Sequence, residues 1–203
     1  MLNTIALLLT GAVAAYLLWR FWTRYRQTKA LYDVYYLMGF TVLLVSGLLL
    51  LILGLGILKS PYVLTVATLI PLGISMGLME QYLREYKKLF KWFALFGFLA
   101  IAASAIGGFD LVKKISVPLF HGIAGLVIFL LPFFVAGKKA AQGFWWVGIG
   151  GALIGLGGIA LAFLSAGSQL LFFSADLVML ILTPLLLLMT LAFTYGFVKD
   201  IRK

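Results

Sequence analysis

Ionisable side chains are scarce within the apolar stretches of this sequence, and three of them could form a polar site: His121, Asp176 and Asp110. His121, the single histidine, and Asp176 each fall about one and a half turns into an apolar stretch, counted from the same side. A histidine and an aspartate within hydrogen-bonding distance could hold a proton or a cation, and Asp110 in the preceding loop could join them. Alternatively, each side chain caps or hydrates a helix end, where the helix dipole favours an acid.

Other chemistry finds little support in the residues. The chain has no cysteine and one histidine, which excludes a Cys/His pair, a cysteine metal site and a bis-histidine haem or metal site. The motifs HExxH and GK[ST] are absent. Ser116, His121 and Asp176 could be assembled into a hydrolytic set, but their spacing gives no support for it. We therefore expect no metal and no cofactor. Because the residues form no recognisable catalytic set, we expect that the protein is not an enzyme.

The elements that must position these side chains are seven apolar spans. With 64% apolar and 11% charged residues, the chain has too little polar surface for a soluble globule. Each span approaches or exceeds the roughly 20 residues needed to cross about 30 Å of hydrocarbon. The expected spans are 2–22, 31–57, 61–82, 90–108, 115–136, 144–166 and 171–197. The sequence predicts an all-α integral membrane protein, a single-domain bundle of seven helices over residues 1–203.

Positive charge indicates the orientation of these spans. Of the sixteen lysines and arginines, all but Lys59, Lys113 and Lys114 flank the same side. By the positive-inside rule that side is cytoplasmic, so the N-terminus lies outside and the C-terminus inside, in agreement with an odd number of crossings. Basic residues follow the first span rather than precede it, so we expect a membrane helix there and not a cleaved signal peptide. We expect an integral protein of a prokaryotic cell membrane.

The same basic side carries the candidate contacts with lipids or a partner. All five tryptophans lie there, as expected of rings that anchor at the headgroup zone. We interpret the net charge of +10 as topology and attraction to anionic lipids, and expect no nucleic acid partner. The stretch 80–91 is expected to continue the third span as a helix, with Glu80 paired to Arg84 and Asp33 paired to Lys29. Candidate docking or lipid contacts are Arg24, Arg26, Arg84, Lys87 and Lys88.

Proline and glycine are distributed unequally among the spans. Pro71, Pro132 and Pro184 lie inside the third, fifth and seventh spans, where each frees a carbonyl and could bend the helix, either as a hinge or as a static bend. Pro61 and Pro118 fall near expected helix starts. Gly151, Gly155 and Gly158 give the sixth span a smooth surface for close helix packing or for contact with a lipid or substrate. Hydroxyl groups in the third and seventh spans are expected to bond to their own helices.

An internal repeat is a further possibility. Residues 1–85 superpose on residues 114–198 at an offset of about 113, which aligns Pro71 with Pro184 and Tyr82 with Tyr195. This suggests a 3+1+3 parallel duplication, as some small transporters have, although evenly spaced apolar helices also align at multiples of their period.

These features favour a small protein that binds or translocates a small solute, ion or lipid. The alternative is a sensory, scaffold or accessory subunit that docks a protein partner through its basic cytoplasmic face. A retinal protein is not expected, because no lysine lies between Lys139 and Lys199.

Overall fold

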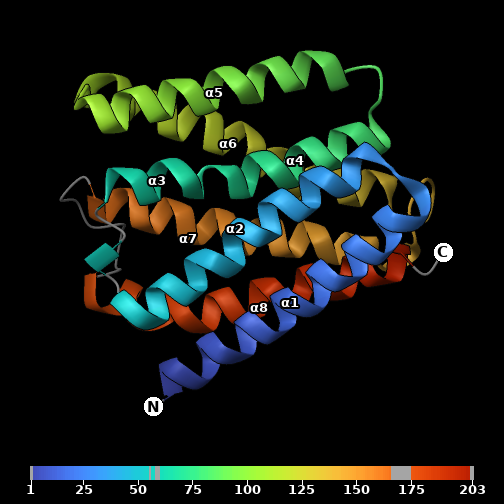
Figure 1. Cartoon of the computed structure of the whole chain (residues 1–203), viewed down its shortest axis with the longest axis horizontal. Helices are drawn as coiled ribbons and strands as arrows, with labels where there is room; N and C mark the ends of the chain where they lie inside the picture. The colour runs from blue at the N-terminus through green and yellow to red at the C-terminus, as the bar shows by residue number, and fades with distance from the viewer. Residues whose placement is uncertain (1, 55, 58–59, 166–174, 202–203) are drawn as a thin grey trace.

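The computed structural model describes the backbone of residues 2–54, 56–57, 60–165 and 175–201, and side chains within these ranges except those of 2–4, 50, 159–165 and 175–179. The described chain is helical, which confirms the all-α class (Figure 1). Its elements are α1 (Leu2–Thr28), α2 (Leu31–Leu53), α3 (Pro61–Ala67), α4 (Leu69–Tyr82), α5 (Lys87–Gly107), α6 (Asp110–Val135), the short 3-10 helix η2 (Gln142–Phe144), α7 (Trp145–Ser165) and α8 (Ala175–Ile201).

Helices long and apolar enough to cross a membrane account for six of the expected spans within the described residues. They are Ile5–Thr28, Leu31–Leu53, Pro61–Tyr82, Lys87–Gly107, Asp110–Val135 and Leu180–Ile201. The remaining expected span falls on α7, a helix of 21 residues whose last side chains lie outside the described part of the chain. The chain is thus a bundle of apolar, membrane-type helices.

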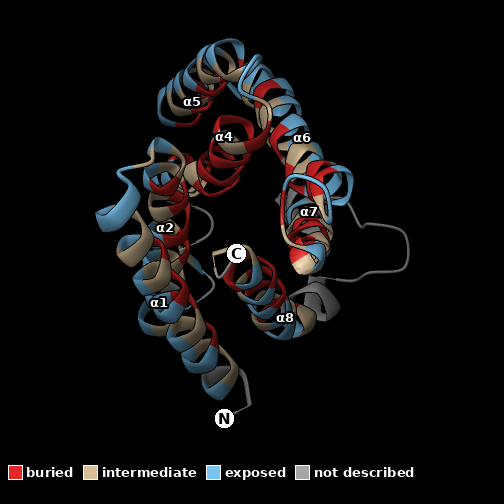
Figure 2. Cartoon of the chain, turned by 90° about the vertical axis from the view of Figure 1, so that its right-hand side faces the viewer, coloured by how far each residue is buried: buried red, intermediate tan, exposed pale blue. Residues whose placement is uncertain are grey.

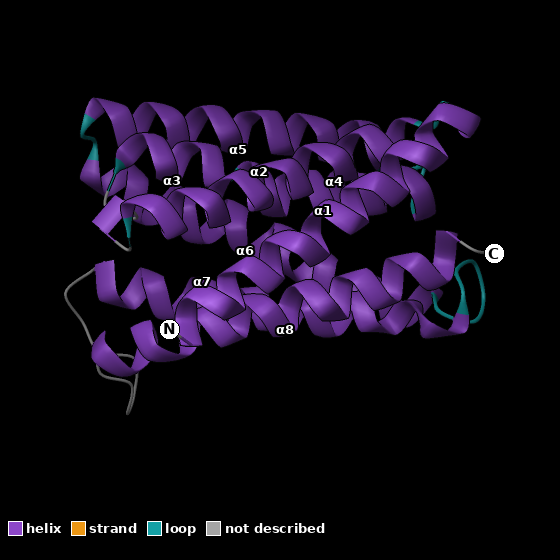
Figure 3. Ribbon diagram, turned by 60° about the horizontal axis from the view of Figure 1, so that its bottom comes forward, coloured by secondary structure: helices purple, strands orange, loops and turns teal. Residues whose placement is uncertain are grey.

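Six of the helices form a closed ring when the bundle is viewed along its axis (Figure 2). Around the ring, α1 packs on α2, α2 on α4, α4 on α6, α6 on α7, α7 on α8, and α8 returns to α1. Helix α5 lies outside this ring against α3, α4 and α6. The helices run along the long axis of the molecule (Figure 3), so their connections gather at the two ends.

Short turns make the sequential helices antiparallel neighbours. Lys29 ends α1 with a positive φ of 53°, and its N–H donates to the carbonyl of Tyr25. Only Lys29 and Ala30 separate α1 from α2. Gly108 has a φ of 72° and caps α5, its N–H donating to Ser104, which is the left-handed position that glycine adopts without strain.

The third span is divided where its interior proline frees a carbonyl. A helix ladder would bond the carbonyl of Ala67 to the N–H of residue 71, which Pro71 lacks. The helix is accordingly interrupted at Thr68, between α3 and α4. Pro132 and Pro184 instead lie within α6 and α8, which run on without interruption.

Two expectations about helix ends are wrong. The stretch 80–91 is not one helix: α4 ends at Tyr82, Leu83 leaves the helical region (φ −123°, ψ 58°), and α5 begins at Lys87. Glu80 makes ion pairs with Lys87 and Lys91 across this turn. Pro118 is not near a helix start, because α6 already begins at Asp110.

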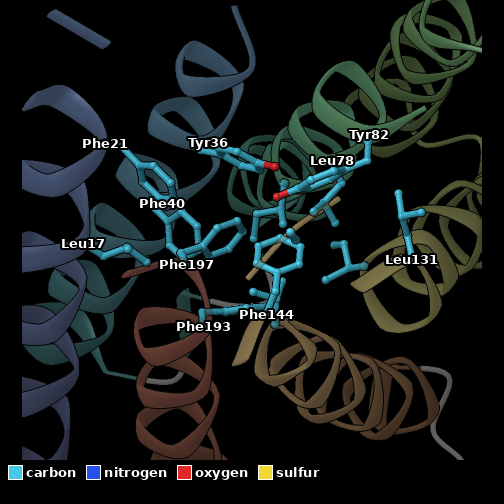
Figure 4. Close-up of a cluster of buried hydrophobic side chains, with 14 of the residues drawn as sticks. Leu17, Phe21, Tyr36, Phe40, Leu78, Tyr82, Leu131, Phe144, Phe193 and Phe197 are labelled. Carbon is cyan, nitrogen blue, oxygen red and sulfur yellow. The ribbon is translucent and has the colours of Figure 1, made fainter. Parts of the chain in front are cut away.

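Aromatic side chains fill the ring between α1, α2 and α8 (Figure 4). The ring centroids of Tyr36 and Phe197 lie 4.8 Å apart, and Phe21 lies 5.0 Å from Tyr36 and 5.1 Å from Phe197. Phe40 and Phe193 pack in an edge-to-face pair at 5.6 Å. All five side chains are fully buried, and they form the floor beneath the polar groups described next.

Candidate functional site

The basic ends of the helices meet at one end of the bundle, the right-hand end in Figure 1. The ends of α1, α4 and α8 and the segment between α6 and α7 are joined there by polar contacts. We call the central group of these contacts the Asp200 network. It consists of Arg24, Asp33, Tyr36, Gln81, Tyr82 and Asp200.

Asp200, in the last turn of α8, accepts hydrogen bonds on both carboxylate oxygens. Its Oδ2 accepts from Gln81 Nε2 at 3.0 Å and from the Tyr82 hydroxyl at 2.8 Å. Its Oδ1 accepts from the backbone N–H of Ala141 at 3.1 Å. Arg24 Nη1 lies 3.7 Å from Oδ2. One carboxylate therefore binds α1, α4 and the segment that follows α6.

Arg24 joins a second carboxylate to this group. Its Nε and Nη2 donate to Asp33 Oδ1 at 2.8 and 2.6 Å. The guanidinium also lies 5.5 Å from the ring centroid of Phe21 and 5.0 Å from that of Tyr32. The Asp33 side chain is fully buried, and its Oδ2 has no hydrogen-bond partner among the described residues.

Tyr36 connects the aromatic floor to the polar network. Its ring is buried among Phe21 and Phe197, while its hydroxyl donates to Gln81 Oε1 at 2.9 Å. Gln81 then donates to Asp200, so a chain of hydrogen bonds crosses from α2 through α4 to α8. The amphipathic ring of Tyr82 behaves similarly, packing 5.2 Å from Phe144 and donating to Asp200.

Glycines bring α2 and α4 close enough for these contacts. A Cβ on Gly73 would lie 2.9 Å from the backbone N of Gly39 and from the carbonyl oxygen of Tyr35. A Cβ on Gly77 would overlap the ring of Tyr36. The space beside Gly77 therefore lets the Tyr36 ring reach its position, and the small-xxx-small spacing of Gly73 and Gly77 is a signal that the sequence carries.

The two ion pairs predicted between residues one helical turn apart at this end are wrong. Asp33 binds Arg24, nine residues earlier, rather than Lys29, whose Nζ lies over the ring of Tyr25. Glu80 binds Lys87 and Lys91, both at 2.8 Å, rather than Arg84. Helix α1 continues through its basic residues, and α2 packs back against it. Ion pairs between different helices therefore replace the expected ion pairs along a single helix.

The candidate docking residues divide into two groups. Arg24 turns inward and Lys87 is bound to Glu80, so neither is a free surface cation. Arg26, Arg84 and Lys88 are exposed. The exposed group is the one that could meet lipid headgroups or a partner.

The residues of the candidate outer site are not gathered at one depth. Because α6 already begins at Asp110, His121 lies near the middle of this helix, deeper than the one and a half turns expected. It is half-buried, and its Nδ1 has no partner among the described residues. Asp110 is exposed and binds Lys113 at 2.8 Å in the first turn of its own helix. The side chain of Asp176 lies outside the described residues. Helix α7 packs between α6 and α8, the helices that carry His121 and Asp176.

The glycines proposed for packing in α7 differ in their surroundings. A Cβ on Gly151 would lie 2.8 Å from the backbone of α6 at Ile128 and Phe129, so this glycine permits close approach. A Cβ on Gly155 or Gly158 would meet no atom of the described residues within 4 Å. The hydroxyl groups of Thr65, Thr68, Ser75 and Thr190 donate to carbonyls of their own helices, as predicted. Thr194 departs from this prediction, because its buried hydroxyl has no hydrogen-bond partner among the described residues.

Signals for the Asp200 network are weak in the sequence. Asp200 stands between Lys199 and Arg202, and Gln81 follows Glu80, so each resembles an ordinary polar residue at a helix end that faces water. Comparison with known proteins finds no matching family model, no matching curated protein and no matching solved structure.

Proposed function

We propose that this chain is a small membrane translocator of seven crossings, in which the Asp200 network forms the cytoplasmic gate. Two three-helix units make up its halves. The first unit is α1, α2 and α3/α4, the second is α6, α7 and α8, and α5 connects them. The basic end faces the cytoplasm of a prokaryotic cell, as the positive-inside rule predicts, and the cargo is a small solute.

The order of helices around the ring supports the two-unit arrangement. The last helix of each unit packs on the first helix of the other, through α4 with α6 and α8 with α1. A parallel duplication at an offset of about 113 residues would produce this cyclic order. That offset aligns Pro71 with Pro184, although the helix is interrupted before Pro71 and runs on through Pro184.

The observation that carries the gate proposal is the set of bonds that cross between the units. Asp200 of the second unit is bound to Arg24, Gln81 and Tyr82 of the first unit. Lys139 Nζ of the second unit lies 3.4 Å from the carbonyl oxygen of Tyr82. Bonds concentrated at one end of an interface between packed bodies can hold that end closed while the bodies rock.

The test is the separation of the two units at the basic end. Spin labels on the cysteines of Arg26→Cys and Lys138→Cys, one exposed site on each unit, report this distance by pulsed electron paramagnetic resonance in a chain without native cysteine. Asp200→Asn removes the negative charge and replaces one acceptor oxygen by an amide group, which cannot accept the hydrogen bonds that reach this side chain. We expect a population with a longer separation in this variant, and no change with Asp110→Asn at the exposed, opposite end.

Permeation is measured on the same variants in liposomes. Glycerol, urea and a monosaccharide serve as test solutes, with vesicle shrinkage followed by light scattering. Asp200→Asn should change the rate of protein-dependent permeation, whereas Asp110→Asn should not. An unchanged label separation, or equal permeation through both variants, contradicts the gate.

An accessory subunit that docks a protein partner is the second candidate. It is favoured by the exposed turn between α4 and α5, where Arg84 and Lys88 stand beside Leu89, which is 71% exposed. A docking protein should co-purify with a stoichiometric partner, and should lose it when Arg84 and Lys88 are both replaced by glutamine. Attraction of these cations to anionic lipids is expected in either case.

A further inference from the structure

Asp33 is the least satisfied member of the Asp200 network. Both guanidinium nitrogens that reach it bind the same oxygen, Oδ1. Its Oδ2 is buried and has no hydrogen-bond partner among the described residues. Asp200 differs, because its two oxygens accept three hydrogen bonds. A buried carboxylate oxygen without a donor is costly to keep charged.

The charges of the network do not balance if both acids are ionised. Arg24 is one cation between two carboxylates, Asp33 and Asp200. The other titratable groups that face them are the neutral phenols of Tyr32, Tyr36 and Tyr82. One negative charge therefore remains inside the network.

The neighbouring cations are engaged elsewhere. Lys29 lies over Tyr25, Lys87 and Lys91 bind Glu80, and Lys139 contacts the carbonyl oxygen of Tyr82. Lys199 lies over the ring of Tyr195. Among the described residues, none of these lysines neutralises Asp33.

We infer that Oδ2 of Asp33 is a proton-binding site, occupied by one exchangeable proton while the Asp200 network is intact. This inference rests on the proposed gate and names the ion to which the gate responds. A proton suits the site better than a metal ion, because a metal ion needs several oxygen ligands and the described residues contain no group of three or more acids or histidines.

Binding of the proton changes the charge between the two units. With Asp33 neutral, Arg24 and Asp200 form a balanced pair across the boundary between the units. With Asp33 ionised, Arg24 is drawn to Asp33 within the first unit, and the two carboxylates repel each other across that boundary. Proton binding at Oδ2 therefore stabilises the closed gate, and proton release loosens it.

Infrared difference spectroscopy of the unmodified protein during a pH titration tests the site directly. We expect a stretching band of a protonated carboxyl group that disappears on raising the pH. The band should be missing in Asp33→Asn and retained in Asp110→Asn. A spectrum without the band, or a band that survives in Asp33→Asn, overturns the inference.

The spin-label pair introduced by Arg26→Cys and Lys138→Cys tests whether proton binding at Asp33 is coupled to the gate. In the wild-type background the separation should lengthen as the pH rises, while Asp33→Asn, an uncharged side chain of nearly the same size, should keep the short separation throughout. A pH response in Asp33→Asn equal to that of the wild-type background contradicts the coupling. Failure of the gate itself is recognised separately, because Asp200→Asn would then leave the separation unchanged even if Asp33 carries its proton.

Discussion

At the scale of the residue, Arg24 is the side chain on which the basic end of the bundle depends most. It is the only described cation that lies within 4.0 Å of both Asp33 and Asp200. Its side chain is 11% exposed, and the rings of Phe21 and Tyr32 lie against the guanidinium. A guanidinium held in this way presents fixed donors to two carboxylates, which a lysine cannot reproduce.

Replacing Arg24 by methionine should strongly destabilise the protein. The change keeps an apolar stem but removes the cation that contacts both Asp33 and Asp200, and leaving a buried carboxylate without its cation costs about 3–5 kcal/mol. The free energy of unfolding can be followed by tryptophan fluorescence as sodium dodecyl sulfate is added to mixed micelles.

The matched control is Arg26→Met, two residues further on and exposed. This change should alter the free energy of unfolding by no more than about 0.5 kcal/mol. Adding Asp33→Asn to Arg24→Met should recover part of the loss, because both residues belong to one pair. Equal stability of the two methionine variants would show that the ion pair contributes nothing.

At the scale of the element, the positions of the helices follow from apolarity, whereas their ends and partners do not. The spans are predictable because about 20 apolar residues in succession have no other stable environment. Helix α1 nevertheless runs on to Thr28, six residues past its expected end at residue 22, and carries Arg24 along it. Asp33 then meets a residue nine positions earlier, a contact that no rule of local spacing along one helix predicts.

The spacing of glycines predicted that helices pack closely, but not which glycines make the close contacts. The sequence has small-xxx-small pairs at Gly151 and Gly155 and also at Gly73 and Gly77. In the structure Gly151 faces the backbone of α6 and a Cβ on Gly155 would meet no atom of the described residues within 4 Å, while Gly73 faces the backbone of α2. The choice depends on which face of a helix meets a neighbour, and apolarity on all sides of a membrane helix hides that face.

Replacing Gly73 by alanine should separate α2 from α4. The added Cβ would lie 2.9 Å from backbone atoms of Gly39 and Tyr35, which cannot rotate away, and overpacking of this kind costs about 1–3 kcal/mol. Gly47→Ala is the control, since that position in α2 has nothing within 4 Å and alanine should gain about 0.5–1 kcal/mol of helix stability. The free energies of unfolding of the two variants are compared in sodium dodecyl sulfate. Equal values would contradict the close contact at Gly73.

At the scale of the whole molecule, the sequence predicted the gathering of the positive charges at one end but not the network that they surround. Arg24 and Asp200 are 176 positions apart, and Asp200 follows a lysine in a basic tail, so only the closing of the ring by α1 and α8 brings them together. A lone histidine in an apolar span is conspicuous, whereas an aspartate among lysines is not.

The proposed orientation predicts which ends of the helices reach each side of the membrane. Single cysteines at Lys88 and Lys138, exposed at the basic end, should react with a membrane-impermeant maleimide only after intact cells are permeabilised. A cysteine at Lys114, exposed near the start of α6 at the opposite end, should react in intact cells. The chain contains no other cysteine, so each signal reports one position. The reverse pattern would keep the bundle but invert it, and the Asp200 network would then face the outside, where it could not act as a cytoplasmic gate.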